Sequence, residues 1–440
     1  MAYIAAFLLC GGTAMSAERT ESQRWFEDAK FGVFIHWGAF SVPAKGEWVM
    51  KEDGMKIADY EEMAKGFNPV KFNAAEWVSL IKSAGARYIT LITKHHDGFC
   101  LFDSKLTRYD VIDWAPFGRD VVKELSDECH RQGLKIFFYY SHLDWHHPDY
   151  YPLGWTGWEN GRQPGGDWKK YVEYYEGQLR ELCGNYGKIG GIWFDGWWDK
   201  PEADWDLKGA YGIIHGLQPE AMICNNHHVK PFPGEDYQAY ERDFPGEDKF
   251  GYSATSVISN LPLETCGTLN DSWGYNAGDR NFKPLKEIIW YLVGAACRNA
   301  NLLLNIGPMP DGEIDGTSRE RLRQIGEWMK KNGDSIYGTR GGPYGYAKWG
   351  GSTWKDRRVF LHVNRLTGLK NIPGISSKIV SAELSGGGKL DVREGEKGLE
   401  INVPLKMADK IDTIIILNTE NPGPFLQDEG KRIMITKKNR

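Results

Sequence analysis

Six short apolar runs, separated by helix-length segments, constrain the fold of this chain more than any other feature. They lie at Phe31–Ile35, Tyr88–Thr93, Lys135–Tyr140, Gly191–Phe194, Ala221–Cys224 and Asn301–Ile306. Each run shows little alternation of apolar and polar residues, which is typical of strands buried on both faces of a parallel sheet.

The segments between these runs carry the start and stop signals of helices. The clearest begins after Asn73 and ends at Gly85, and two more begin after Asp120 and Asp167, with glycines (Gly133 and Gly184) at their expected ends. Repeated strand–helix units of this length predict an α/β fold, and within it a (β/α) barrel rather than a bundle or a sandwich.

The pattern of the sequence changes near residue 340. An expected helix at Ser318–Asn332 is followed by the break Arg340–Pro343, and then by short alternating segments at Val359–Asn364, Lys378–Leu384, Gly398–Val403 and Thr413–Leu417. This pattern predicts a small antiparallel β domain. We therefore expect a barrel domain at 18–340 and a β domain at 341–440.

The first residues predict export. The apolar stretch Tyr3–Gly12 is too short to span a bilayer and is followed by small residues at Thr13–Ala17, so residues 1–17 are expected to be a signal peptide of a periplasmic or secreted protein. Leu8-Leu9-Cys10 also resembles a lipoprotein box, but Leu9 stands where a small residue is expected. The other six cysteines form no CxxC pair, which indicates buried free thiols.

Charge and composition narrow the class of ligand. Lys and Arg number 54 against 59 Asp and Glu, and basic residues cluster only at the end of the chain, which argues against nucleic acid or an anionic membrane as the partner. A small neutral substrate fits better. The 18 Trp residues suit a pocket with rigid faces for sugar or aromatic rings.

Polar and aromatic residues follow the apolar runs, where the strands of a barrel present their active site. They are His36-Trp37-Gly38, Lys94-His95-His96-Asp97-Gly98, Tyr139-Tyr140-Ser141, Asp195-Gly196 and Asn225-Asn226-His227-His228. We expect these side chains to converge on one rim.

Asp195 is the sharpest candidate on this rim. It ends the run Gly190–Phe194, where an unpaired carboxylate is costly, and Gly196 after it lets a ligand approach closely. We interpret Asp195 as a nucleophile or catalytic base; the alternative is a helix cap or an ion-pair partner. Such chemistry needs a second carboxyl, and the candidates are Glu235, Asp236, Glu241, Asp243 and Glu264.

Three pairs of adjacent histidines raise the question of a metal: His95/His96, His146/His147 and His227/His228. Neighbours on an extended segment point to opposite sides, so each pair offers at most one inward ligand, and no HxH or HExxH spacing occurs. We expect no catalytic metal and interpret these residues as partners of a polyhydroxylated ligand, with a structural role as an equal alternative for His146, His147 and His228. No phosphate-binding glycine motif is present, and no cofactor is expected.

Several longer motifs occur in a fixed order. They are WFEDAKFGVFIHWGAFSVP at Trp25–Pro43, KHHDGF at Lys94–Phe99, YYSHLDWHHPDYY at Tyr139–Tyr151, GGIWFDG at Gly190–Gly196, SWGY at Ser272–Tyr275 and NLLLNIGP at Asn301–Pro308. Together they strongly resemble glycoside hydrolase family 29, the retaining α-L-fucosidases, over roughly residues 24–340. The resemblance implies a catalytic (β/α) barrel followed by a β-sandwich, with fucose in a deep pocket.

The resemblance also implies roles for individual residues. Asp195 matches the nucleophile, and the positions that hold the sugar hydroxyls or stack on the C5 methyl side are His36, Glu47, Trp48, His95, His96 and Tyr139. Many relatives carry Asn-Asp-Arg where this chain has Asn225-Asn226-His227. His227 is therefore the candidate contact there, and a fucose-like sugar such as α-L-galactose stays open.

The sequence thus predicts an exo-acting retaining glycosidase that releases α-L-fucose from glycans or glycoconjugates. The local pattern favours Glu241 as the acid/base residue, with Glu264 and Glu235 as alternatives, and the two carboxyls should stand about 5–5.5 Å apart. Two rival functions are a carbohydrate-binding protein that lost hydrolysis and a metal-dependent barrel hydrolase. The oligomeric state is left open.

Overall fold

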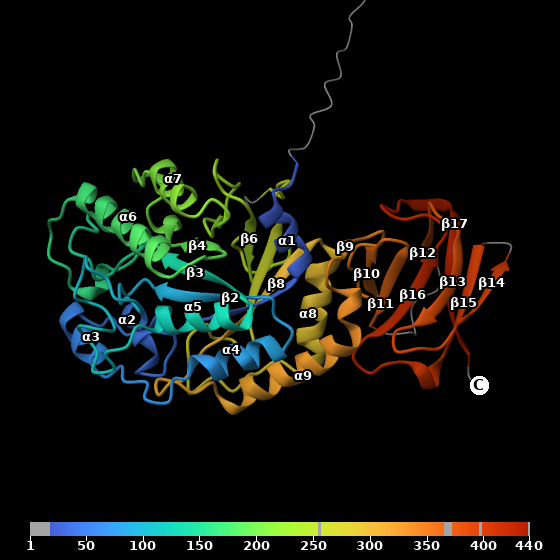
Figure 1. The fold of residues 1–440 in the computed structure, drawn as a ribbon, viewed down its shortest axis with the longest axis horizontal. Coiled ribbons are helices and arrows are strands. Elements are labelled where there is room, and N and C mark those ends of the chain that lie inside the picture. Colours follow the sequence, from blue (N-terminus) through green and yellow to red (C-terminus); the bar gives the residue numbers. More distant parts are fainter. Residues whose placement is uncertain (1–17, 254–256, 365–371, 396–397, 439–440) are drawn as a thin grey trace, which may run out of the picture.

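The computed structural model describes residues 18–253, 257–364, 372–395 and 398–438. Figure 1 shows a barrel surrounded by helices on the left and two further sheets, coloured orange and red, on the right. The predicted signal peptide at residues 1–17 lies outside the described residues. Among the described residues, no helix is both long enough and apolar enough to cross a membrane.

The barrel contains eight parallel strands. They are β1 (Phe31–Ile35), β2 (Tyr88–Lys94), β3 (Lys135–Ser141), β4 (Gly191–Asp195), β5 (Met222–Asn225), β6 (Gln238–Glu241), β7 (Leu263–Thr268) and β8 (Ala300–Ile306), in the order β5-β4-β3-β2-β1-β8-β7-β6. The two end strands approach each other where the backbone N–H groups of Asp236 and Tyr237 donate to the carbonyl of Ile223, at 2.7 and 3.4 Å. The predicted (β/α) barrel is confirmed.

Nine α-helices of the described chain accompany these strands. They are α1 (Glu21–Ala29), α2 (Val49–Glu52), α3 (Ile57–Ala64), α4 (Ala74–Ser83), α5 (Val121–Gln132), α6 (Trp168–Asn185), α7 (Leu207–Leu217), α8 (Leu285–Cys297) and α9 (Gly316–Asn332). The predicted caps are present: Asn73 accepts from the Glu76 N–H at 3.1 Å and Asp120 from the Lys123 N–H at 2.8 Å. Gly184 does not end α6, which runs one residue further.

Large aromatic side chains fill the inside of the barrel. Phe34, Tyr88, Phe137 and Trp193 pack together there with Leu303 of β8. They form a solid floor, as is usual for eight-stranded barrels. A ligand can therefore enter only above this layer, at the ends of the strands.

The C-terminal residues form two packed sheets. One contains β13 (Ile379–Leu384), β16 (Thr413–Thr419), β11 (Arg358–Val363), β10 (Gly350–Lys355) and β9 (Arg340–Gly341), and the other contains β12 (Ile372–Ile375), β17 (Gln427–Lys438), β15 (Gly398–Pro404) and β14 (Asp391–Gly395). Neighbouring strands are antiparallel except for the pair β15 and β17. Leu361 and Ile415 of the first sheet share a core with Ile401 and Ile433 of the second, which confirms the expected sandwich.

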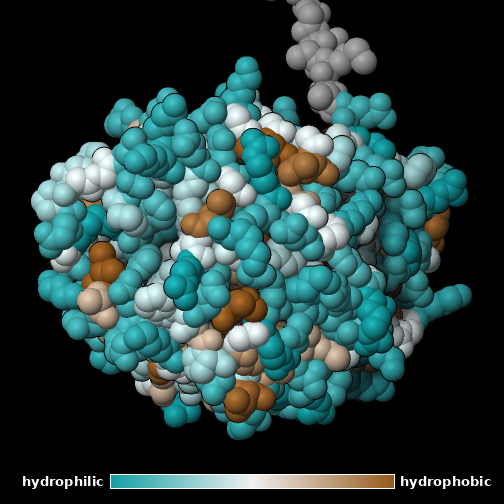
Figure 2. All heavy atoms as spheres, turned by 60° about the vertical axis from the view of Figure 1, so that its left-hand side comes forward, coloured by the Kyte–Doolittle hydropathy of each residue, from teal (hydrophilic) through white to brown (hydrophobic). Residues whose placement is uncertain are grey.

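The surface is mostly hydrophilic and the thiols lie inside the fold. On the face drawn in Figure 2, hydrophilic residues dominate and hydrophobic ones are scattered rather than gathered in one patch. The six cysteines of the described residues are free and buried, as predicted.

Candidate active site

A cavity of about 710 Å³ opens at the carboxyl ends of the barrel strands. Eight of the nine predicted site residues line it: His36, Glu47, Trp48, His95, His96, Tyr139, Asp195 and Glu241. The ninth, His227, does not. Further lining residues include Trp193, Trp198, Asn226, His228, Arg242 and Trp273.

Asp195, the last residue of β4, is held by several hydrogen-bond donors. The hydroxyl of Tyr139 donates to Oδ2 at 2.9 Å, and the backbone N–H of Gly196 and the indole of Trp198 donate to Oδ1 at 2.8 and 3.0 Å. Gly196 has a φ of +82°, and a Cβ there would lie 2.6 Å from the Cβ of Leu143. Only glycine fits this turn, which fixes the carboxylate in one orientation.

Glu241, the last residue of β6, lies beside Asp195. The amide Nδ2 of Asn226 is 2.9 Å from Glu241 Oε2 and 3.4 Å from Asp195 Oδ1. One neutral nitrogen thus lies within hydrogen-bond reach of both carboxyls, which places them side by side in the cavity.

Burial and mutual repulsion set the protonation of this pair. Burial, followed by the charge of Glu241, raises the pKa of Asp195 to about 6, and burial also raises the pKa of Glu241. Hydrogen-bond donors favour the ionised form of a carboxyl. Tyr139, Gly196 and Trp198 donate to Asp195, while Asn226 and the charge of Arg242 act on Glu241, so each carboxyl has neighbours that favour its ionised form.

His36, directly after β1, presents a proton acceptor to the cavity. Its Nδ1 is 2.5 Å from Oδ1 of Asn305, whose Nδ2 donates to the carbonyl of Trp273 at 2.7 Å. This network places the proton on Nδ1, so Nε2 carries the lone pair. Burial lowers the pKa of His36 to about 3, and the ring is neutral.

His96 has the same tautomer for a similar reason. Its Nδ1 is 2.7 Å from the hydroxyl of Ser141, which itself donates to the carbonyl of Leu143 at 2.6 Å. Its Nε2 lies 3.7 Å from Asp195 Oδ2. Burial lowers the pKa of His96 to about 3, so His96 is neutral and does not neutralise Asp195.

Aromatic rings and one further acid complete the wall. His95 stacks on Tyr139 with ring centroids 5.5 Å apart, and Trp48 stacks on Trp198 at 6.0 Å. Glu47 accepts from the Gly274 N–H at 2.7 Å, and burial raises the pKa of Glu47. Both His95 and His96 line the cavity, contrary to the expectation of one inward member per pair, because β2 ends at Lys94 and the pair lies in the turn that follows.

The structure places His227 outside the cavity. Its Nε2 is 3.0 Å from Oε1 of Glu235, and both side chains are buried. His228 lines the cavity instead, with its Nε2 3.8 Å from Oε2 of Glu241. Glu235, which contacts His227, does not line the cavity either.

Glu264, the other alternative acid, is buried inside the barrel. It accepts from the hydroxyl of Tyr88 at 2.5 Å and from the indole of Trp193 at 3.0 Å, and burial raises its pKa to about 7. It does not line the cavity. Of the three acids considered for proton transfer, only Glu241 does.

Arg242 is a cavity residue that the sequence reasoning missed. Its guanidinium donates to the carbonyl of Asp271 at 2.9 Å and lies 5.0 Å from the ring centroid of Trp273. Arg242 brings a guanidinium to the cavity wall from the residue directly after β6 and Glu241. The charged pair Glu241-Arg242 at the end of a short run was the available signal.

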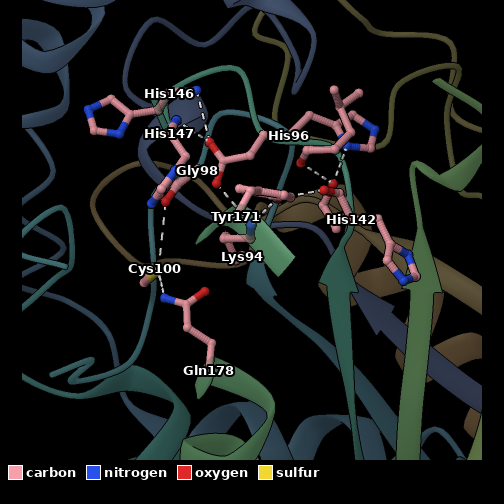
Figure 3. Close-up of polar contacts among 12 residues, drawn as sticks. Lys94, His96, Gly98, Cys100, His142, His146, His147, Tyr171 and Gln178 are labelled. Atoms are coloured by element: carbon pink, nitrogen blue, oxygen red, sulfur yellow. Dashed lines mark hydrogen bonds and ion pairs between the residues drawn. The ribbon is translucent and has the colours of Figure 1, made fainter. Parts of the chain in front are cut away.

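A buried ion pair lies at the end of β2; Figure 3 labels its lysine, Lys94, together with Tyr171 and His142. Lys94 Nζ is 2.9 Å from Asp144 Oδ2 and 3.3 Å from the hydroxyl of Tyr171, which donates to the carbonyl of His142 at 2.5 Å. The backbone N–H of His142 donates to the carbonyl of Asp195 at 2.7 Å. This chain of contacts links the end of β2 to the backbone of the candidate nucleophile.

Comparisons with known proteins show the family of this chain. The family described as alpha-L-fucosidase matches residues 11–334. The plasma alpha-L-fucosidase of Pongo abelii is 32% identical over 350 residues, which is 74% of this chain and 71% of the relative. The tissue alpha-L-fucosidase of Macaca fascicularis is 30% identical over 424 residues, which is 86% of this chain and 84% of the relative.

Solved structures show the same relationship. Alpha-L-fucosidase isoenzyme 1 from Paenibacillus thiaminolyticus superposes with a TM-score of 0.80 at 34% identity, covering 91% of this chain and 99% of that one. A GH29 alpha-L-fucosidase from Bacteroides thetaiotaomicron, trapped as a covalent intermediate with 2-fluoro-fucosyl fluoride, gives 0.78 at 25% identity, covering 92% and 97%. With the family match spanning most of the chain, these similarities show that the protein belongs to the α-L-fucosidases of glycoside hydrolase family 29.

Proposed function

We propose that this chain is an exo-acting retaining α-L-fucosidase in which Asp195 is the nucleophile and Glu241 the acid/base residue. The observation that carries this proposal is the pair of carboxyls joined by Asn226 in one cavity. Retaining glycosidases need two carboxyls at short separation, one ionised and one protonated. The hydrogen-bond donors around Asp195 favour an ionised Asp195, which leaves the proton to Glu241.

In the first step an oxygen of Asp195 attacks the anomeric carbon as the bond to the leaving oxygen breaks. Glu241 gives its proton to that oxygen, and the sugar is left as an ester of Asp195. In the second step Glu241, now ionised, takes a proton from water, and the water oxygen displaces Asp195 from the anomeric carbon. Two inversions return the original configuration.

The neutral histidines hold the sugar. Nε2 of His36 and of His96 can each accept a hydrogen bond from a hydroxyl, while Trp48 offers an aromatic face. Neither histidine changes its charge near neutral pH, because burial lowers the pKa of both to about 3. They serve in binding rather than in proton transfer.

Replacement of Asp195 by Gly tests the proposal. We expect Asp195→Gly to lose nearly all hydrolysis of an aryl α-L-fucoside while still binding fucose, and added azide to restore turnover with a glycosyl azide of inverted configuration. Near-normal turnover by this variant would reject the assignment. A binding protein without hydrolysis would show no wild-type turnover, and a metal-dependent hydrolase would lose its activity in EDTA. An aryl α-L-galactoside assayed in parallel tests the related sugar.

We also propose that the substrate is a fucosylated glycan met outside the cytoplasm. The predicted signal peptide at residues 1–17 supports export, and the relatives named plasma alpha-L-fucosidase are consistent with it. N-terminal sequencing of the mature protein, together with cell fractionation, tests this. A protein that keeps Met1 and stays in the cytoplasm would contradict it.

A further inference from the structure

Exposed aromatic side chains are concentrated at the mouth of the catalytic cavity. Across the described residues only four Phe, Trp or Tyr side chains are largely exposed: Trp155 (69%), Trp158 (62%), Phe250 (54%) and Tyr252 (41%). Trp155, Phe250 and Tyr252 line the cavity. The other Phe, Trp and Tyr side chains of the described residues are buried or half-buried, Trp158 aside, so three of the four most exposed rings meet at one cavity, which is typical of a binding surface.

The loop that carries Trp155 is firmly held. Buried Asp199, which follows β4, accepts from the backbone N–H and the hydroxyl of Thr156 at 2.8 and 2.7 Å, and from the hydroxyl of Tyr150 at 2.7 Å. The carbonyl of Asp199 also accepts from the Trp155 N–H at 3.1 Å. A Cβ at Gly154 would lie 2.1 Å from Asp199 Oδ2, so only glycine allows this approach. The exposed indole is thus presented on a fixed backbone.

The other two aromatic residues lie on the loop after β6, next to the acid/base residue. Buried Asp243 accepts from the Phe250 N–H at 3.2 Å. Tyr252 stacks on His228 with ring centroids 5.2 Å apart, and His228 Nε2 lies 3.8 Å from Glu241 Oε2. Since Glu241 must reach the leaving oxygen, these rings lie on the side from which the leaving group departs.

We propose that Trp155, Phe250 and Tyr252 form a second subsite that binds a neutral pyranose ring of the leaving group. The inference rests on the proposed function and specifies its substrate class as fucosylated oligosaccharides. The C–H face of a pyranose is apolar and packs on aromatic rings, whereas its hydroxyl groups remain available to polar neighbours. Glu52 and Asp271, which also line the cavity, can accept hydrogen bonds from such hydroxyls.

The test compares two substrates that differ only in the leaving group. α-L-Fucosyl fluoride leaves the proposed subsite empty, and a fucosylated disaccharide of neutral sugars fills it. We expect Trp155→Ala to lower the ratio of kcat/KM for the disaccharide to kcat/KM for the fluoride about 10- to 100-fold, because the contact exists with only one substrate. Phe250→Ala should lower the same ratio.

Trp158→Ala is the control for the loop itself, because Trp158 is exposed and does not line the cavity but donates its indole N–H to the carbonyl of Gly154 at 2.8 Å. Its ratio should equal that of the wild type. An unchanged ratio in Trp155→Ala and Phe250→Ala, or an equal fall in Trp158→Ala, overturns the subsite. Failure of the wild type to hydrolyse either substrate would instead reject the proposed function.

Discussion

Asn226 donates its side-chain amide to Glu241 across 2.9 Å while the same nitrogen lies 3.4 Å from Asp195. The two reacting carboxyls thus share one neutral donor. A donor without charge stabilises an ionised carboxyl less than a cation would, and it adds no positive charge that would ionise both carboxyls. Asn226 therefore lets the pair hold one proton near neutral pH.

Replacement of Asn226 by Asp tests this relationship. A third carboxyl adds negative charge and removes the donor, and both effects raise the pKa values of Asp195 and Glu241. We expect both limbs of the pH profile of kcat/KM for an aryl fucoside to move to higher pH in Asn226→Asp. Asn225→Asp is the control, because Asn225 does not line the cavity and donates to Tyr211 at 3.1 Å. Equal shifts in both variants would contradict the assigned role.

The raised pKa of Asp195 predicts a cost in stability. Burial raises this pKa from 3.8 to about 6 in the folded protein, so the folded state binds the proton more tightly than the unfolded state does. Ionisation of Asp195 therefore destabilises the folded state. This cost is absent below about pH 4, grows between about pH 4 and pH 6, and is complete above about pH 6. A shift of this size corresponds to about 1–3 kcal/mol.

We therefore expect Asp195→Asn to raise the free energy of unfolding at pH 7, by on the order of 1–3 kcal/mol, while removing activity. The gain should shrink as the pH falls from 6 to 4. Chemical denaturation at several pH values measures it. A gain that does not vary with pH would show that charge is not its cause.

His36 should contribute to binding rather than to proton transfer. Removal of its ring leaves a sugar hydroxyl without its acceptor, so His36→Ala should weaken fucose binding by about 1–3 kcal/mol in calorimetry. His227→Ala is the control, because His227 is buried against Glu235 outside the cavity and its loss should change stability but not affinity. Equal affinity in His36→Ala and wild type would place His36 outside the sugar contact.

Much of the site could be predicted because parallel strands present their ends at one rim. His36, His95, His96, Tyr139 and Asp195 follow or end apolar runs, and all five line the cavity. The strands β6 and β7 were harder to recognise, since their sequences QAYE and LETCGT are not apolar runs. Polar side chains there are buried through specific partners, as Glu264 is by Tyr88 and Trp193.

The positions of His228, whose role was left open, and of Arg242, which was missed, depend on backbone conformation. His228 and Arg242 have φ values of +62° and +59°, a backbone conformation that residues other than glycine adopt only rarely. These turns direct His228 into the cavity while His227 meets Glu235, and they bring Arg242 to the wall. A pattern of residue types does not reveal a left-handed backbone conformation. The sequence therefore could not predict which of His227 and His228 faces the cavity.

The acid/base assignment of Glu241 makes the sharpest prediction, because it depends on the leaving group. A natural fucoside releases an alcohol that needs a proton, whereas a nitrophenyl fucoside does not. Glu241→Ala should therefore lose far more kcat/KM on the natural substrate, by about 10²–10⁴-fold, and its pH profile should lose the basic limb. Glu264→Gln is the comparison, because Glu264 lies in the barrel interior and does not line the cavity. Its rates on the two substrates should change in parallel. If Glu264→Gln shows the selective loss and Glu241→Ala does not, the role belongs to Glu264 and the contact with Asn226 is structural.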